Sequence, residues 1–342
     1  MLYRLYNSDQ HVASFVFEKG VIADFSPEKK HLLPMQIREA AADGFTNWVC
    51  ERAVNLNLAL NRRLAYELTG SRDKKAIAIA MHLFSVSDTF TCFADGEFVP
   101  RMELCDPEKH AYVSDFILSG GTTPIPEKGI ITPNLCTDGR FPKTWKYENG
   151  EWWLYKIQSS MAARSEREIS RVLMACGWDT GDYQYDGRYR TRIRSKNFVG
   201  ENEFFEPYDS LRFMFKDRSD EEAVIYQNIA SLGERFEKNF RRILLADALF
   251  MNNDRHMRNY GVIRSSVTGE ILRMAPNFDN NQAYLSVPGA HYSNGMLRSF
   301  EKMYGLTKED ASDFQALLNE CRNRAFLKNV FEAGTEFLLS RI

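Results

Sequence analysis

The chain has 342 residues, of which 44% are hydrophobic and 13% aromatic, so it carries enough apolar side chain for a sizeable core. Its 44 basic and 46 acidic side chains give a formal net charge of −2, which provides no general attraction to nucleic acid. No apolar run of about eighteen residues could span a bilayer, and Met1 to Gln10 lack the basic-then-apolar form of a secretory signal. We expect a folded, cytoplasmic protein that binds neither nucleic acid nor membrane directly.

The cysteines do not form a pattern typical of a metal site or a disulfide framework. They are scattered and include no Cys-x-x-Cys pair: Cys50, Cys92, Cys105, Cys136, Cys176 and Cys321. We therefore expect reduced thiols and no zinc.

The first region, residues 1–115, mixes short strand-like and helical patterns. Helices are predicted at 45–56 and 61–68, and Gly70 to Arg72 reads as a break between elements. These patterns assign no role to the region.

A hairpin is predicted where two aromatic-rich runs, 145–147 and 152–157, flank the turn Glu148-Asn149-Gly150. Lys156 falls on its second strand, where a lysine can reach the α- and β-phosphates of a nucleotide. An isolated strand lysine is more often a surface residue, but the acids farther along the chain favour the phosphate role. A helix predicted at 165–176 carries Glu166 and Glu168, one of which would pair with Lys156, although a solvated helix face also explains both acids.

Residues 188–196 alternate cationic and other side chains. As a strand, the run places five cations on one face: Arg188, Arg190, Arg192, Arg194 and Lys196. Such a face holds a phosphate-rich partner or keeps an edge strand soluble, and the second explanation is the more common one.

A buried helix predicted at 240–250 is followed by a polar cluster that contains Asp254 and Asn259. Two short strands, 260–263 and 271–274, then form a hairpin that would return the chain and place Asp279 beside Asp254. Phosphoryl transfer needs a carboxylate near the attacking hydroxyl and hard oxygen ligands for magnesium. Asp254 is thus the predicted base, and Asn259 and Asp279 the predicted metal ligands. A salt-bridged surface loop would explain any single Asp-Arg pair, but not this ordered set.

His256 lies between the predicted base and the predicted metal amide. We include it among the catalytic residues as a supporting group. A histidine at such a place more often braces the loop by hydrogen bonds than transfers protons.

These residues resemble a known family. The runs 252–261 and 275–280 look like the core of the HipA-like serine/threonine kinases, and 137–145, 152–156 and 195–198 are similar to segments upstream of that core. The Asp-Arg-His-x-x-Asn element also occurs in phosphatidylinositol kinases. The resemblance covers about residues 118 to 285. Where many relatives have glycine soon after the metal aspartate, this chain has Asn280-Asn281, and asparagine tolerates a left-handed backbone.

The resemblance implies an α+β, two-lobed, protein-kinase-like fold with an additional N-terminal α/β region and a helical C-terminal lobe. Residues 1–115 would form the N-terminal region, 116–202 the nucleotide-binding lobe and 203–342 the helical catalytic lobe. The family pattern favours Glu166 as the partner of Lys156. It also makes 203–207, with Phe205 at its centre, the hinge whose backbone would bind adenine.

Two segments are candidates for the loop that covers the phosphates. Residues 119–123 contain two glycines, and residues 134–139 lie directly before the hairpin, where a nucleotide lid belongs. Position favours the second segment, with Thr137 and Gly139 as its contacts and Thr137 as a candidate autophosphorylation site. Pro124, Pro126, Pro133 and Pro142 mark the whole stretch as turn-rich, which is also compatible with simple connecting loops.

The resemblance therefore implies a kinase that uses ATP and Mg²⁺ to phosphorylate serine or threonine of an unidentified protein. It further implies a possible toxin of a toxin–antitoxin pair, silenced by a small DNA-binding antitoxin. A lipid or small-molecule kinase would use the same phosphate machinery, and a catalytically inactive nucleotide-binding interaction protein is the other alternative.

Overall fold

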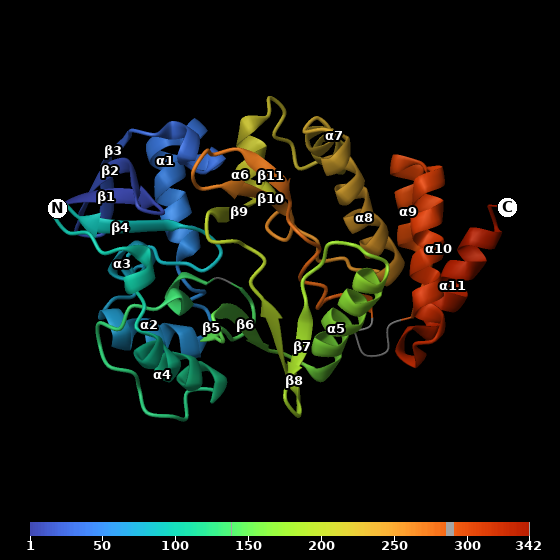
Figure 1. Ribbon diagram of the computed structural model, residues 1–342, viewed down its shortest axis with the longest axis horizontal. Coiled ribbons are helices and arrows are strands. Elements are labelled where there is room, and N and C mark those ends of the chain that lie inside the picture. The colour runs from blue at the N-terminus through green and yellow to red at the C-terminus, as the bar shows by residue number, and fades with distance from the viewer. Residues whose placement is uncertain (138, 285–290, 342) are drawn as a thin grey trace. The chain divides into compact units, whose positions relative to one another are not determined.

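The computed structural model describes residues 1–137, 139–284 and 291–341 (Figure 1). Their contacts divide the chain into two compact units, each built from separate stretches of sequence. Unit 1 contains residues 1–157, 196–214 and 262–273, and unit 2 contains 158–195, 215–261 and 274–342. Within the described ranges, no helix is both long enough and apolar enough to cross a membrane.

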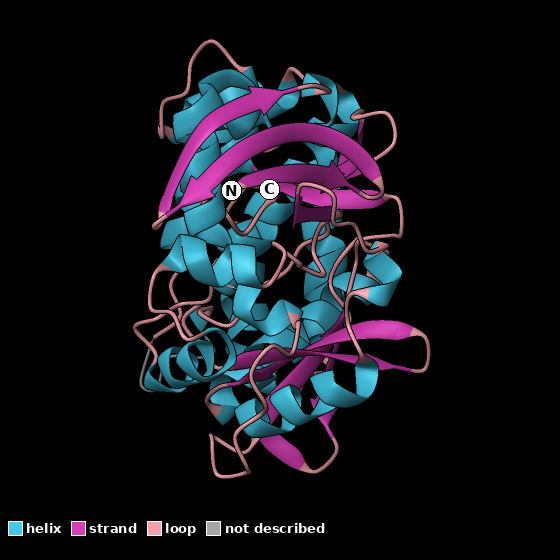
Figure 2. Cartoon of the chain, turned by 90° about the vertical axis from the view of Figure 1, so that its left-hand side faces the viewer, coloured by secondary structure: helices cyan, strands magenta, loops and turns pink. Residues whose placement is uncertain are grey.

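Unit 1 begins with a four-stranded antiparallel sheet of order β3-β2-β1-β4. The strands are β1 (Leu2–Asn7), β2 (Gln10–Glu18), β3 (Val21–Pro27) and β4 (Phe90–Ala94). Figure 2 shows their pronounced curvature, with strands drawn in magenta. Helix α1 (Met35–Arg52) buries its apolar side chains against this sheet, and the rings of Phe15 and Phe45 meet with centroids 4.8 Å apart. Such an aromatic pair fixes the helix on the sheet.

The boundaries predicted for the first helix were wrong at both ends. Helix α1 begins at Met35, directly after Pro34, and ends at Arg52. It stops there because Ala53 is extended and the N–H of Val54 donates to the carbonyl of Leu135 over 2.8 Å, a tertiary contact that sequence spacing does not reveal.

A second group of helices completes the first part of unit 1. It comprises α2 (Ala59–Thr69), α3 (Lys74–Ala80), α4 (Pro107–Leu118) and a 3₁₀ turn (Pro133–Cys136). The predicted helix at 61–68 lies inside α2, and the predicted break is a left-handed cap at Gly70, with φ of 73°. Leu64, Phe116 and Leu135 share one buried cluster, which joins the turn to the helices.

Both predicted hairpins are present in unit 1. Strands β5 (Lys143–Glu148) and β6 (Glu151–Ile157) pair antiparallel about a turn in which Asn149 and Gly150 both have positive φ. A second sheet of order β11-β10-β9 contains β9 (Glu203–Pro207), β10 (Gly261–Ser265) and β11 (Ile271–Met274). The short helix α6 (Tyr208–Leu211) follows β9 directly.

Unit 2 is mainly helical. Its elements are α5 (Ser160–Ala175), β7 (Tyr183–Asp186), β8 (Tyr189–Lys196), α7 (Glu222–Ala230), α8 (Glu234–Phe250), α9 (Gly295–Tyr304), α10 (Lys308–Arg322) and α11 (Lys328–Leu339). Helix α8 supplies Leu249 to a core that also contains Phe314 of α10 and Phe337 of α11. Helix α5 starts five residues before its predicted start because the Ser159 hydroxyl caps it by accepting from the N–H of Ala162.

Candidate functional site

The polar cluster predicted after the buried helix begins where α8 ends. Met251 takes a left-handed conformation with φ of 52°, which stops the helix. The side chain of Asn252 then turns back and donates to Oδ1 of Asp247 over 3.0 Å. The loop that follows is thus anchored to the last turn of α8, and its direction is fixed.

The guanidinium of Arg255 joins the two segments that carry the predicted catalytic residues. It is buried and binds both carboxylate oxygens of Asp247 at 2.9 Å. Its Nη1 also donates to the carbonyls of Asn259, at 3.1 Å, and Phe278, at 2.5 Å. One nitrogen therefore holds the end of the first segment beside the residue that precedes Asp279.

The charge on Arg255 is retained in this buried position. Burial lowers the pKa of Arg255, but the carboxylate of Asp247 outweighs it, with a smaller contribution from Asp279, and the net pKa is raised. An arginine with a fixed charge and five donors is suited to bind several carbonyls and one carboxylate together.

The loop from Asp254 to Asn259 is closed by its own hydrogen bonds. The carbonyl of Asp254 accepts from the N–H of His256 at 3.0 Å and from the side-chain amide of Asn259 at 3.5 Å. The ring of His256 is exposed, and its Nδ1 accepts from the N–H of Arg258 at 3.3 Å, an arrangement that braces the loop. Asn259 itself is buried, with its amide nitrogen turned toward the loop carbonyl.

Asp279 is held in a left-handed conformation, with φ of 62°. Its N–H donates to the hydroxyl of Tyr183 at 3.0 Å, and its Oδ1 accepts from the amide of Asn281 at 3.0 Å. Asn280 is bonded through its side chain to Arg255 at 2.9 Å, and through its carbonyl to Ser165 at 2.9 Å. In this segment the left-handed residue is thus Asp279 itself, and the two asparagines are fixed by specific hydrogen bonds.

In unit 1, Lys156 has a neighbour that the sequence analysis missed. The register of the β5–β6 hairpin places Lys143 directly opposite Lys156, so both side chains lie on one face. Lys156 is only 6% exposed. Two ammonium groups on one face of a hairpin match the negative charge of phosphate oxygens.

Gly139 lies against Lys143. It has φ of 146°, and a Cβ built at this position would lie 2.0 Å from Nζ of Lys143. The positive φ favours glycine at this position, and a side chain here would also displace the flexible end of Lys143. Of the predicted phosphate loop, Thr137 donates its hydroxyl to the carbonyl of Pro133 at 2.8 Å, and Asp138 lies outside the described residues.

Hydrogen bonds tie the start of this loop to strand β5. The amide of Asn134 accepts from the N–H of Trp145 at 2.8 Å and donates to the hydroxyl of Thr144 at 2.7 Å. The other candidate loop ends helix α4, because the N–H groups of Gly120 and Gly121 donate to carbonyls of its last turn. Helix termination explains those glycines, which favours residues 134–139 as the phosphate loop.

Two further candidates have defined surroundings. Glu166 is fully buried on α5 and accepts from the amide of Gln158 at 2.6 Å. Glu168 is instead ion-paired with Arg167 at 2.5 Å and Arg324 at 3.6 Å, which leaves Glu166 as the better candidate for a lysine partner. The N–H of Phe205 donates to the carbonyl of Ser87 at 3.0 Å, so an adenine would have to use other groups of this segment.

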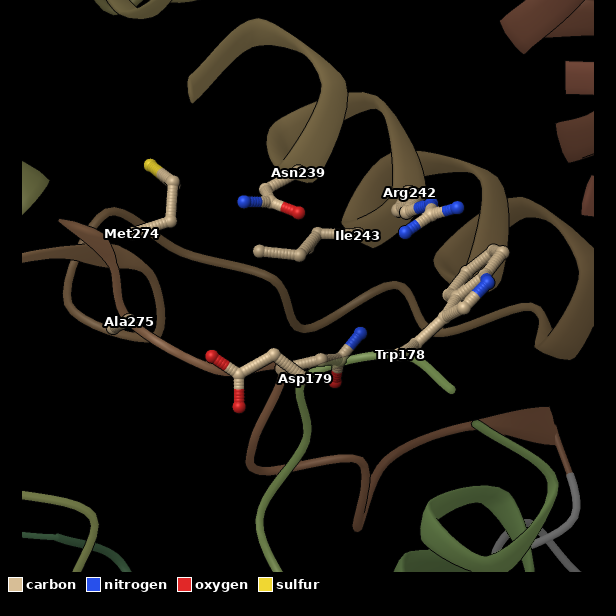
Figure 3. Close-up of a pocket in the computed structure, with 8 residues that line it drawn as sticks. Trp178, Asp179, Asn239, Arg242, Ile243, Met274 and Ala275 are labelled. Carbon is tan, nitrogen blue, oxygen red and sulfur yellow. The ribbon is translucent and has the colours of Figure 1, made fainter. Parts of the chain in front are cut away.

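A small cavity lies next to the segment that carries the predicted metal ligand Asp279 in unit 2 (Figure 3). Asn239 and Arg242 of α8 line one wall, and Asp179, Ala275 and Asn277 line the remainder. Its volume is about 20 Å³, enough for a water molecule but far below that of a nucleotide site. The buried Nδ2 of Asn277 has no hydrogen-bond partner among the described residues, which makes it the natural contact for such a water.

No family model and no curated protein sequence matches this chain. Among solved structures, it is similar to Shewanella oneidensis HipA, from a structure of that toxin–antitoxin system with HipB and operator DNA. The TM-score is 0.59 at 15% identity, and the match covers 98% of this chain and 91% of that chain. A proinflammatory kinase of Helicobacter pylori, CtkA, matches 58% of this chain and 89% of its own at 16% identity, with a TM-score of 0.40. The chain has a HipA-like fold, and the predicted α+β class is confirmed.

Proposed function

We propose that this chain is a kinase that transfers the γ-phosphoryl group of ATP, with Mg²⁺, to serine or threonine of a protein. The observation that carries the proposal is the contact of Arg255 with the carbonyls of both Asn259 and Phe278. It brings together the two segments that carry the proposed base, Asp254, and the proposed metal ligands, Asn259 and Asp279. The HipA-like fold supports the same reading.

The chain supplies the groups that such a reaction needs. Asp254 would accept the proton of the acceptor hydroxyl, and Asn259 and Asp279 would hold magnesium through an amide oxygen and a carboxylate. Lys156 and Lys143 would neutralise phosphate oxygens, and Gly139 would let the loop backbone approach them. ATP and Mg²⁺ supply the phosphoryl group and much of the charge neutralisation.

The donor set fits magnesium. Within the described ranges, no group of three or more histidine, cysteine, aspartate or glutamate side chains could hold a metal ion. Magnesium is commonly bound by one or two protein oxygens, together with water and phosphate, so it does not require such a group.

The setting of the kinase is part of the same proposal. The HipA-like fold supports a cytoplasmic toxin restrained by a small DNA-binding antitoxin, because the similar Shewanella oneidensis structure contains HipA with HipB and operator DNA. Thr137 is proposed as an autophosphorylation site. Its hydroxyl is bonded to the carbonyl of Pro133, so modification would require the loop to change conformation. A phosphopeptide map in which Thr137 stays unmodified in active protein would disprove that assignment.

The decisive experiment is transfer of radiolabelled γ-phosphate by purified protein, with Mg²⁺, to proteins of a cell lysate and, separately, to phosphatidylinositol vesicles. We expect protein labelling that falls about 10²- to 10⁴-fold in Asp254→Asn and is also lost in Asp279→Asn. Asp217→Asn is a matched control, because Asp217 is exposed in unit 2 and its carboxylate accepts from the N–H of Ser219.

Each alternative has its own outcome in this experiment. Labelling of vesicles but not protein would establish a lipid kinase. ATP binding without turnover, unchanged in Asp254→Asn, would establish an inactive nucleotide-binding protein.

A further inference from the structure

The hairpin formed by β7 and β8 carries a concentration of positive charge. Residues 182–195 contain four arginines and two acids, Asp182 and Asp186, and so have a net charge of +2 in a chain of net −2. We propose that this hairpin binds single-stranded nucleic acid, which revises the expectation drawn from the net charge of the whole chain. The inference concerns binding only and does not depend on the proposed kinase activity.

Protection of a sheet edge does not explain these arginines. Strand β8 pairs antiparallel with β7 on one side. On its other side, the carbonyl of Thr191 accepts from the N–H of Gln158 at 2.9 Å. Ile193 is fully buried with Ala163, which fixes the apolar face of the strand inward. The arginines of β8 alternate with Ile193 and lie on the opposite face. Because β8 has partners on both sides, protection of an edge does not account for them.

Lys196 does not belong to this charged surface. Its ammonium is ion-paired with Glu151 at 2.5 Å. The sequence pattern of five cations thus reduces to four arginines, of which Arg194 contacts the amide of Gln184 at 3.3 Å.

Arg190 and Arg192 stack on tyrosines, of which Tyr185 is partly buried and Tyr189 is exposed. The guanidinium of Arg190 lies 4.5 Å from the ring centroid of Tyr185, and that of Arg192 lies 4.4 Å from Tyr189. Tyr189 is 44% exposed. Arg192 is also ion-paired with Asp186 at 3.8 Å, whereas in the part of the chain that the structure describes neither Arg188 nor Arg190 forms an ion pair. Stacking fixes the plane of a guanidinium and leaves its edge donors available to an anion.

The chemistry of this surface favours single-stranded nucleic acid over an acidic protein. Side chains two residues apart on a strand are separated by about 6.7 Å, comparable to the distance between successive phosphates of a nucleic acid. Guanidinium and tyrosine planes together offer both phosphate contacts and stacking surfaces for bases. A carboxylate-rich peptide would bind the guanidinium groups but would not stack on the aromatic planes.

The test is fluorescence anisotropy of a labelled oligouridylate of about 16 nucleotides, titrated with the full chain at about 50 mM salt. We expect Arg188→Gln/Arg190→Gln/Arg192→Gln to weaken binding at least about tenfold. The same variant should reduce the slope of log affinity against log salt by about 2, since each single-strand phosphate contact contributes about 0.7.

A matched triple variant controls for net charge. Arg298→Gln/Lys302→Gln/Arg322→Gln removes three exposed cations of unit 2 that lie on other elements, and we expect binding within about twofold of the parent. Equal weakening in both triple variants, or no binding at low salt, would overturn the proposal. So would polyglutamate that competes as well as unlabelled oligonucleotide. Thermal unfolding of each variant shows whether the hairpin arginines act on binding and not on folding.

Discussion

Two buried arginines, one in each unit, bind a carboxylate and several backbone carbonyls in the same way, but we expect different roles for them. Arg255 in unit 2 binds the carboxylate of Asp247 and the carbonyls of Asn259 and Phe278. Arg264 in unit 1 is fully buried and binds the carboxylate of Glu206 at 2.5 Å.

The two arginines differ in the segments that their carbonyl partners come from. Arg264 donates to Leu33 at 3.0 Å, His31 at 2.9 Å and Gly269 at 2.9 Å, which are connections between elements. The partners of Arg255 lie beside the predicted base and metal ligands. We therefore expect Arg264 to support mainly the stability of unit 1, and Arg255 to support mainly the geometry of catalysis.

The largest expected effect tests the structural arginine. Arg264→Met leaves the Glu206 carboxylate buried without its cation, and should lower the free energy of unfolding by about 3–5 kcal/mol in urea denaturation. Adding Glu206→Gln removes the buried charge while keeping acceptors for the N–H of Met35 and the hydroxyl of Ser210, and should restore part of that loss. If the double variant is no more stable than Arg264→Met, the charge on Glu206 is not the cause.

A second test compares how the stability of the two units depends on pH. Burial lowers the pKa of His110 in unit 1 to about 4, from an ordinary value of 6.5, while its ring bonds to Thr132 and the carbonyl of Trp145. The unfolded chain binds this proton more readily, so the contribution of neutral His110 is complete above pH 6.5 and is lost as pH falls toward 4. It amounts to at most about 3 kcal/mol.

Urea denaturation at several pH values measures this contribution. His110→Gln should flatten the decline between pH 6.5 and 4, whereas His291→Gln, at an exposed position in unit 2, should not. An unchanged decline in the His110 variant would assign the acid sensitivity to other groups.

The third test concerns Arg255, the buried arginine of unit 2. Arg255→Lys keeps the positive charge beside Asp247 but cannot reach all the carbonyls, so the two segments should shift relative to each other. We expect phosphoryl transfer to fall about 100-fold or more, because small misplacements of reacting groups are costly, while the free energy of unfolding falls by about 1–2 kcal/mol. A variant that loses stability and keeps its rate would contradict the contrast with Arg264.

Local patterns predicted the hairpins and the end of α8, because each depends on neighbouring residues. The turn Asn149-Gly150 fixes the β5–β6 register, and counting outward from it already pairs Lys143 with Lys156. The sequence therefore contained the signal for the second lysine, which we missed by considering each lysine alone.

Contacts between distant segments could not be predicted in this way. The bonds of Arg255 to Phe278 and of Arg264 to Leu33 span 23 and 231 residues, and an arginine in a chain with 44 basic side chains does not indicate its partner. For the same reason the sequence suggested the acids of the proposed site, but not the groups that hold them in place.

Tyr183 is one of these supporting groups, and it offers the smallest and most specific test. Its buried hydroxyl accepts from the N–H of Asp279, which is left-handed and therefore needs external support. Tyr183→Phe removes one hydrogen bond, so we expect kcat to fall about tenfold and the Mg²⁺ dependence to move to higher concentration, with little change in thermal unfolding. Tyr185→Phe, on the same strand, should leave both unchanged. A loss of rate at saturating Mg²⁺ without a shifted Mg²⁺ dependence would mean that Tyr183 positions the chemistry but not the metal ligand.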